Sequence, residues 1–159
     1  MKEEIAISNS SCQFADHEIT SKLKGKRLLG IFVNKLVFHY TQKENILQYV
    51  FVTDAFLHEM NLKYLQHDSY TDIITFDLSE KKSGIIDGEI YISIDRIKEN
   101  AAHEGVKYMH ELYRVILHGA LHLCGFDDKT KSQKDTMRTL ETEWLEKYLT
   151  LQKEMRKII

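Results

Sequence analysis

A long apolar run from Val106 to Cys124 does most to constrain how this chain of 159 residues can fold. The run is too long for a strand, and the sequence contains no proline that would interrupt a helix. Its second half is apolar nearly all round, at Val115, Ile116, Leu117, Ala120, Leu121 and Leu123. A helix of this kind belongs in a protein core, so we expect it to pack against a sheet.

Two histidines, His118 and His122, lie near the end of this run. Residues four apart on a helix are separated by roughly 6 Å along its axis and share one face, so two ring nitrogens can converge on one metal ion. Gly125 follows, and glycine is the usual residue at the left-handed position beyond a helix C-terminus. The chain can therefore turn there and bring Asp127 or Asp128 back toward the two rings.

Two imidazoles and one carboxylate leave a coordination position open for water, as in catalytic zinc sites. The same set is used by non-haem iron, so a divalent ion other than zinc stays open. A pair of histidines four apart also occurs by chance, in which case neither aspartate binds. The zinc peptidase pattern H-E-x-x-H needs a glutamate where this chain has Gly119, which disfavours a metallopeptidase.

The segment from His118 to Asp128 resembles the signature of the YbeY family, the bacterial rRNA maturation endoribonucleases, whose motif reads H-G-x-L-H-L-x-G-[YF]-D-H. Ten of the eleven positions fit, and Asp128 stands where the family usually places a third metal-binding histidine. Thr71 to Phe76 resembles the family's T-D-V-L-S-F strand, and Asp87 to Ser93 resembles its G-D-I-x-I-S strand with the first two letters reversed. The resemblance covers roughly residues 45–145.

This resemblance implies a metal-dependent, single-strand-specific endoribonuclease, a hydrolase that acts in rRNA processing and ribosome quality control. His118, His122 and Asp128 would hold one ion, expected to be Zn²⁺, with both histidines at the catalytic centre. Single-stranded RNA or an rRNA precursor would be the substrate, and the ribosome or ribosomal proteins would be partners. Attack by activated water and attack by the RNA's own 2′-hydroxyl both stay open. The alternatives are a ribosome-assembly binding factor with a structural metal and little nuclease activity, or a metallopeptidase.

One departure concerns the substrate. The family usually carries Tyr-Arg shortly before the T-D strand, and that arginine is thought to contact the phosphate, whereas this chain has Tyr64-Leu65. Lys63 and Arg114 are the candidates to replace it. Arg114 lies one helical turn before His118, on a stripe shared with Glu111, so it is a candidate catalytic residue and equally a candidate structural one. Thr71 and Asp72 are expected to shape a cleft, although Asp72 could instead be a turn or capping residue.

Composition sets further bounds. A net charge of −2 argues against a protein that mainly binds nucleic acid non-specifically, but it allows a local basic patch or positioning by a ribosome. Cys12 and Cys124 provide no disulfide framework, which favours a cytoplasmic location, and Cys124 is expected to serve packing. We expect no signal peptide and no membrane span, since no uninterrupted apolar run approaches ~20 residues; Lys107, Glu111 and Arg114 interrupt the stretch from Val106 to Cys124. The six other histidines have no ligand spacing. Lys22, Lys24, Lys26 and Arg27 are expected to be solvated, with an RNA-facing patch as the alternative.

The periodicities predict nine elements. Strands are expected at Ile5–Ile7, Asn45–Val52, Ile73–Leu78 and Ile85–Ser93, and helices at Lys22–Tyr40, Asp54–Leu65, Asp95–Glu104, Val106–Cys124 and from a capping box at Thr130–Gln133 onward. The second helix is expected to point Leu57, Met60, Leu62 and Leu65 inward. The order β-α-β-α-β-β-α-α-α predicts an α+β fold, with one small mixed four-stranded sheet, helices packed on it and the metal-binding helix in the core. We expect a single domain over residues 1–159 with a frayed tail at 153–159. The sequence leaves the oligomeric state open.

Overall fold

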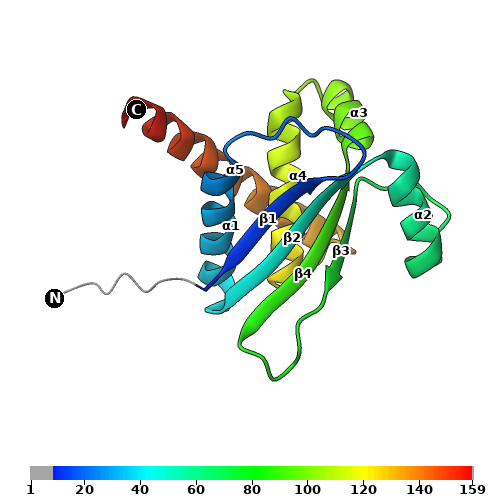
Figure 1. Cartoon of the computed structure of the whole chain (residues 1–159), viewed down its shortest axis with the longest axis horizontal. Coiled ribbons are helices and arrows are strands. Elements are labelled where there is room, and N and C mark those ends of the chain that lie inside the picture. Colours follow the sequence, from blue (N-terminus) through cyan, green and yellow to red (C-terminus); the bar gives the residue numbers. More distant parts are fainter. Residues whose placement is uncertain (1–8, 159) are drawn as a thin grey trace.

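A computed structural model describes residues 9–158 of the chain (Figure 1). Its elements follow the predicted order β-α-β-α-β-β-α-α-α. They are β1 (Ser11–Asp16), α1 (Lys26–Thr41), β2 (Glu44–Val52), α2 (Asp54–Leu65), β3 (Ile73–Asp77), β4 (Ile85–Ser93), α3 (Ile94–Glu104), α4 (Tyr108–Leu123) and α5 (Lys131–Ile158).

The four strands form one mixed sheet in the order β1-β2-β4-β3. β1 and β2 are parallel, as are β2 and β4, whereas β3 runs antiparallel to β4. The predicted α+β fold with a small mixed four-stranded sheet is therefore confirmed. Within residues 9–158, no helix combines the length and the apolar character that a bilayer crossing needs.

Helices α1, α4 and α5 cover one face of the sheet (Figure 1). Alternate residues of β2 and β4 point toward them, because successive side chains in a strand point to opposite faces. Those residues are Leu47, Tyr49, Phe51, Ile86, Ile90 and Ile92, and all of them are buried in the main hydrophobic core. The second half of α4 is buried in the same core, as its apolar sequence predicts.

Two glycines let α4 lie unusually close to the sheet. A Cβ atom on Gly119 would lie 3.0 Å from Cγ2 of Ile90 and 3.1 Å from Cδ1 of Ile73, and one on Gly88 would lie 2.6 Å from Cδ1 of Leu123. Because Gly119 faces the sheet between His118 and His122, this close packing fixes the helix turn that carries both histidines. The sequence showed Gly119 only as the place where a peptidase would have its glutamate.

Helix α2 packs on the opposite face of the sheet, where its Leu57 forms a small buried cluster with Val52 and Ile74. The prediction that Leu62 and Leu65 point inward is wrong, since each is 43% exposed. Met60 is only partly buried. The apolar residues of α2 do not share one face, and Asn61 is buried one turn after Leu57, where its amide donates to the carbonyl of Ser69 at 2.8 Å.

Several boundaries differ from the prediction, and the largest differences lie toward the N-terminal end of the chain. The strand expected at Ile5–Ile7 lies outside the described residues, and the first described strand, β1, was not predicted because only Phe14 in it is buried. α1 begins at Lys26 because Gly25 adopts a left-handed conformation with φ of 68°. Lys22 and Lys24 therefore precede the helix, and both are exposed. α5 is helical as far as Ile158, and fraying of its tail in solution stays a prediction.

Candidate metal site and its pocket

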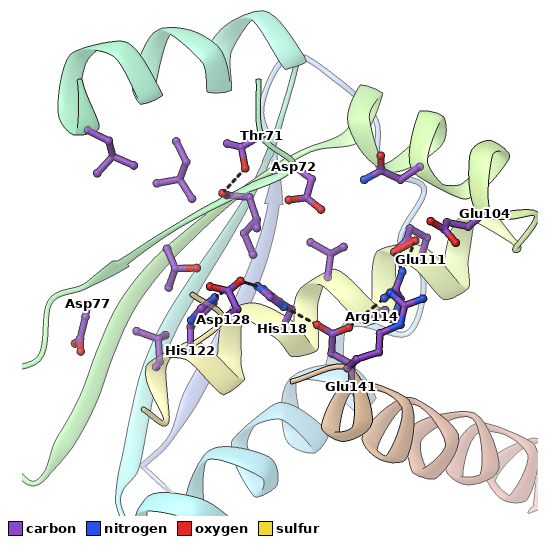
Figure 2. Close-up of a pocket in the computed structure, with 18 residues that line it drawn as sticks. Thr71, Asp72, Asp77, Glu104, Glu111, Arg114, His118, His122, Asp128 and Glu141 are labelled. Carbon is purple, nitrogen blue, oxygen red and sulfur yellow. Dashed lines mark hydrogen bonds and ion pairs between the residues drawn. The ribbon is translucent and has the colours of Figure 1, made fainter. Parts of the chain in front are cut away.

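A pocket of about 720 Å³ opens beside the C-terminal half of α4 (Figure 2). Its walls come from the end of α2, from β3 and the residues before it, from α3, from α4 and from α5. Thr71 and Asp72, predicted to shape a cleft, line it together with His118, His122 and Asp128. The pocket is therefore where the motif residues meet solvent.

His118, His122 and Asp128 form one group, whose potential ligand atoms all lie within 4.8 Å of one another. Oδ2 of Asp128 lies 3.4 Å from Nε2 of His118 and 3.3 Å from Nε2 of His122 (Figure 2). Two donors that each lie about 2.05 Å from a shared tetrahedral ion are separated by about 3.3 Å. The spacing of the donors therefore fits a single metal ion.

The bend after α4 brings Asp128 to the histidines. Gly125 has φ of 101°, as the sequence predicts for a residue that ends the helix, and its amide donates to the carbonyl of His122 at 3.0 Å. Phe126 then packs edge-on against Tyr40 with ring centroids 5.0 Å apart, which anchors the bend. The structure brings Asp128 to the imidazoles, whereas Asp127 is exposed and stands outside the group.

Glu141 of α5 contacts the candidate metal site, and the sequence alone did not single it out. Its Oε2 lies 2.6 Å from Nδ1 of His118 (Figure 2). An ionised carboxylate only accepts hydrogen bonds, so Nδ1 of His118 carries a proton, which leaves Nε2, on the side of Asp128, as the atom that would bind a metal ion. The signal was in the sequence, because Glu141 falls between Met137 and Trp144 on the buried stripe of α5, where a carboxylate needs a partner.

Arg114 is held between two buried carboxylates. One guanidinium nitrogen lies 3.1 Å from Oε1 of Glu141, and the other lies 2.6 Å from Oε1 of Glu111. Burial alone would lower the pKa of Arg114, but its hydrogen bonds to these two glutamates raise it. Glu111, Arg114 and His118 share one face of α4, and Glu141 of α5 links Arg114 to His118, so the four side chains form one ionic network.

The same network sets the charge of His118. Burial lowers its pKa, but the hydrogen bond and charge of Glu141, together with Asp128 and Asp72, outweigh burial, so the pKa is raised. Burial raises the pKa of Asp72, which lines the pocket, against the opposing charge of His118. Without a metal ion, the acidic neighbours of His118 therefore favour its charged form, in which Nε2 carries a second proton.

The remaining residues that the sequence singles out do not belong to the metal group. Leu65 lines the pocket, but Lys63 does not and instead lies over the ring of Tyr64. Burial raises the pKa of Cys124 to about 12, in line with packing rather than thiolate chemistry. His58 lies 2.9 Å from Asp68 and stacks on Tyr70, and none of the six other histidines belongs to the metal group.

Comparison with known proteins decides the family. Residues 9–149 match the family model described as endoribonuclease YbeY. The chain belongs to the YbeY family. A relative named endoribonuclease YbeY from Amoebophilus asiaticus is 39% identical over 132 residues, which cover 80% of this chain and 86% of that protein. Another of that name, from Cytophaga hutchinsonii, is 53% identical over 95 residues, which cover 60% of this chain and 66% of that protein.

A solved structure supports the fold independently. The chain superposes on a solution structure of a Thermotoga maritima protein with a TM-score of 0.58 and 23% identity, covering 90% of this chain and 92% of the other. The likeness shows that the two chains share a fold. The membership of the YbeY family that the segment His118–Asp128 predicts is confirmed by the family match.

Proposed function

We propose that this YbeY-family chain is a cytoplasmic endoribonuclease that cuts single-stranded RNA, with a zinc ion held by His118, His122 and Asp128. One observation carries the proposal: three donors from the end of α4 and its following bend converge at ion-binding distances inside an open pocket. The family's relatives are named as endoribonucleases, and an rRNA precursor, in contact with ribosomal proteins, is the substrate we propose.

Zinc is the natural occupant for two neutral imidazoles and one carboxylate. A bound divalent ion would supply a Lewis acid for a phosphoryl oxygen and would lower the pKa of a nearby water. The chain itself supplies orientation, since Glu141 keeps the proton of His118 on Nδ1 and so directs Nε2 into the pocket.

Arg114 is, in this proposal, a positioning residue. Its guanidinium already satisfies Glu111 and Glu141, so a phosphate could engage it only in competition with two nearby carboxylates. Its role in catalysis is to keep the carboxylate of Glu141 in hydrogen-bonding contact with His118. Asp72 lies in the same pocket, where burial raises the pKa of its carboxyl group.

The test is cleavage of a fluorescent single-stranded RNA by wild type and by His118→Ala, each with its metal content measured by elemental analysis. We expect one ion per wild-type chain, cleavage that a chelator abolishes and zinc restores, and a loss of more than about 100-fold in His118→Ala. His103→Ala is the matched control, because His103 is exposed and belongs to no metal group.

Two results would overturn the proposal. Cleavage that survives both the chelator and His118→Ala would place the activity outside this site. A wild-type protein that holds stoichiometric metal and leaves RNA intact would favour the alternative of a ribosome-assembly binding factor. A duplex of the same sequence tests strand specificity, and we expect it to be cut far more slowly.

A further inference from the structure

The charge of the pocket poses a problem for a polyanionic substrate. Its lining carries six carboxylates and only two guanidinium groups, those of Arg114 and Arg138. The carboxylates belong to Asp72, Asp77, Glu104, Glu111, Asp128 and Glu141. An RNA strand that enters this pocket needs positive charge to offset its phosphates, and an ion at the three ligands supplies it at only one point.

Arg114 does not provide the missing charge. Its side chain is 18% exposed, and its guanidinium is paired with Glu111 at 2.6 Å and with Glu141 at 3.1 Å. Two carboxylates more than neutralise one cation. The Glu111–Arg114–Glu141 group therefore carries a net negative charge, and it attracts no phosphate even though it orients His118.

Arg138 is placed differently. It lies three residues before Glu141 on α5, so the two side chains occupy neighbouring positions on one helix face. Arg138 is exposed and lines the pocket. Across residues 9–158, its guanidinium has no ion pair or hydrogen bond, since Glu141, the carboxylate one turn ahead of it, is taken by His118 and Arg114.

We infer that Arg138 binds a phosphate group of the RNA strand in the pocket and is the residue that offsets the acidic lining for this substrate. The inference rests on the proposed function. A guanidinium presents donors in a planar fork that matches two oxygens of one phosphate, and an unpaired one at the rim can do so without breaking an existing ion pair. The metal group and Arg138 would thus hold the strand at two points.

The first test is the salt dependence of cleavage. In Arg138→Ala, we expect kcat/KM to fall about 10- to 100-fold, the range for losing a hydrogen bond to a charged group. The plot of log kcat/KM against log salt concentration should become shallower by about 0.7, the value for one phosphate contact on single-stranded nucleic acid. Metal content should not change, and Arg138→Lys should recover part of the loss.

Arg156→Ala is the matched control. Arg156 is exposed on the same helix, 18 residues later, which is five full turns and about 27 Å along the axis on the same face. It carries the same charge outside the pocket. Equal kinetics and equal salt slopes for Arg138→Ala and Arg156→Ala would overturn the inference while the proposed function stands.

Equilibrium binding separates the two proposals. Fluorescence anisotropy with the same oligonucleotide and chelator-treated protein reports Kd without turnover, and Arg138→Ala should bind more weakly than Arg156→Ala. If metal-loaded wild type binds RNA but does not cut it, the proposed function fails and the Kd difference alone decides the role of Arg138. Absence of RNA binding in wild type would overturn both proposals.

Discussion

The two walls of the pocket are built in opposite ways. On the side of α4 and α5, Glu111 and Glu141 are almost fully buried, and each is matched by a partner at 2.6 to 3.1 Å. On the side of α2 and the segment that follows it, Leu65 lines the pocket, and further apolar and aromatic side chains outside the pocket face solvent. Leu62, Tyr64, Leu65 and Tyr70 are 43%, 57%, 43% and 58% exposed.

The difference matches two different tasks. Groups that converge on one ion must be held within a fraction of an ångström, which packed and hydrogen-bonded residues on helices achieve. A single strand of RNA is irregular and offers unstacked bases, so the surface that receives it gains from exposed aromatic side chains and from room to adjust. We therefore expect α4 and α5 to hold their side chains rigidly and the pocket edge at the end of α2 to adapt to its substrate.

The largest effect should come from Glu141. Glu141→Ala leaves Arg114 and His118 without a shared buried partner, so we expect a loss of about 3 kcal/mol in the free energy of unfolding. Metal affinity should fall about 10- to 100-fold, as for other partners of metal-bound histidines. Urea denaturation and competitive chelation measure the two quantities.

Glu143→Ala is the control, because Glu143 is exposed on the same helix two residues away. It should leave both quantities nearly unchanged. If Glu141→Ala behaved like Glu143→Ala, the α4–α5 wall would owe its rigidity to apolar packing alone.

The next effect tests the close packing of α4 on the sheet. Gly88→Ala places a Cβ atom 2.6 Å from Cδ1 of Leu123 and 3.2 Å from the carbonyl oxygen of Phe76, so we expect overpacking to cost about 1–3 kcal/mol. Gly84→Ala is the matched control, since nothing lies within 4 Å of its added Cβ and its φ is not positive. Calorimetry that showed equal stability for the two variants would mean that α4 can move away from β4 freely.

A structural feature can be predicted from this sequence when the residues that determine it lie close together along the chain. Local patterns succeed: α2 and β4 have the predicted bounds, and Thr130 and Gln133 cap each other at 3.1 Å as the capping box predicts. The α4 motif likewise predicts that His118 and His122 share a face. These features depend on neighbours within a few residues.

The features that the sequence does not predict depend on distant partners. Glu141 contacts His118 across 23 residues, and its role follows from how α5 packs on α4. β1 is an edge strand whose pairing with β2 spans 35 residues, and its mixed pattern identifies no buried face. The outward Leu62 and Leu65 follow from α2 covering only a small part of the sheet.

The pH dependence of the metal-free protein gives a smaller effect. Because the pKa of His118 is raised above 6.5 in the folded state, its contribution to stability is complete below pH 6.5 and is lost as the pH rises through the folded-state pKa. The loss is about 1.4 kcal/mol for each pKa unit between the two states. Urea unfolding of chelated protein from pH 6 upward should show this decline in wild type and a flatter profile in Glu141→Gln, and parallel profiles would contradict it.

The smallest effect is expected on the other wall. Leu65→Ala removes a side chain that is already 43% exposed, so the free energy of unfolding should change by no more than about 0.5 kcal/mol, with metal affinity intact. Leu57→Ala, on the same helix but fully buried, should cost about 2–5 kcal/mol. Since Leu65 lines the pocket, its loss should raise KM for RNA and leave kcat unchanged. A fall in kcat at constant KM would instead make α2 part of the precise wall, and the division between the two sides would be wrong.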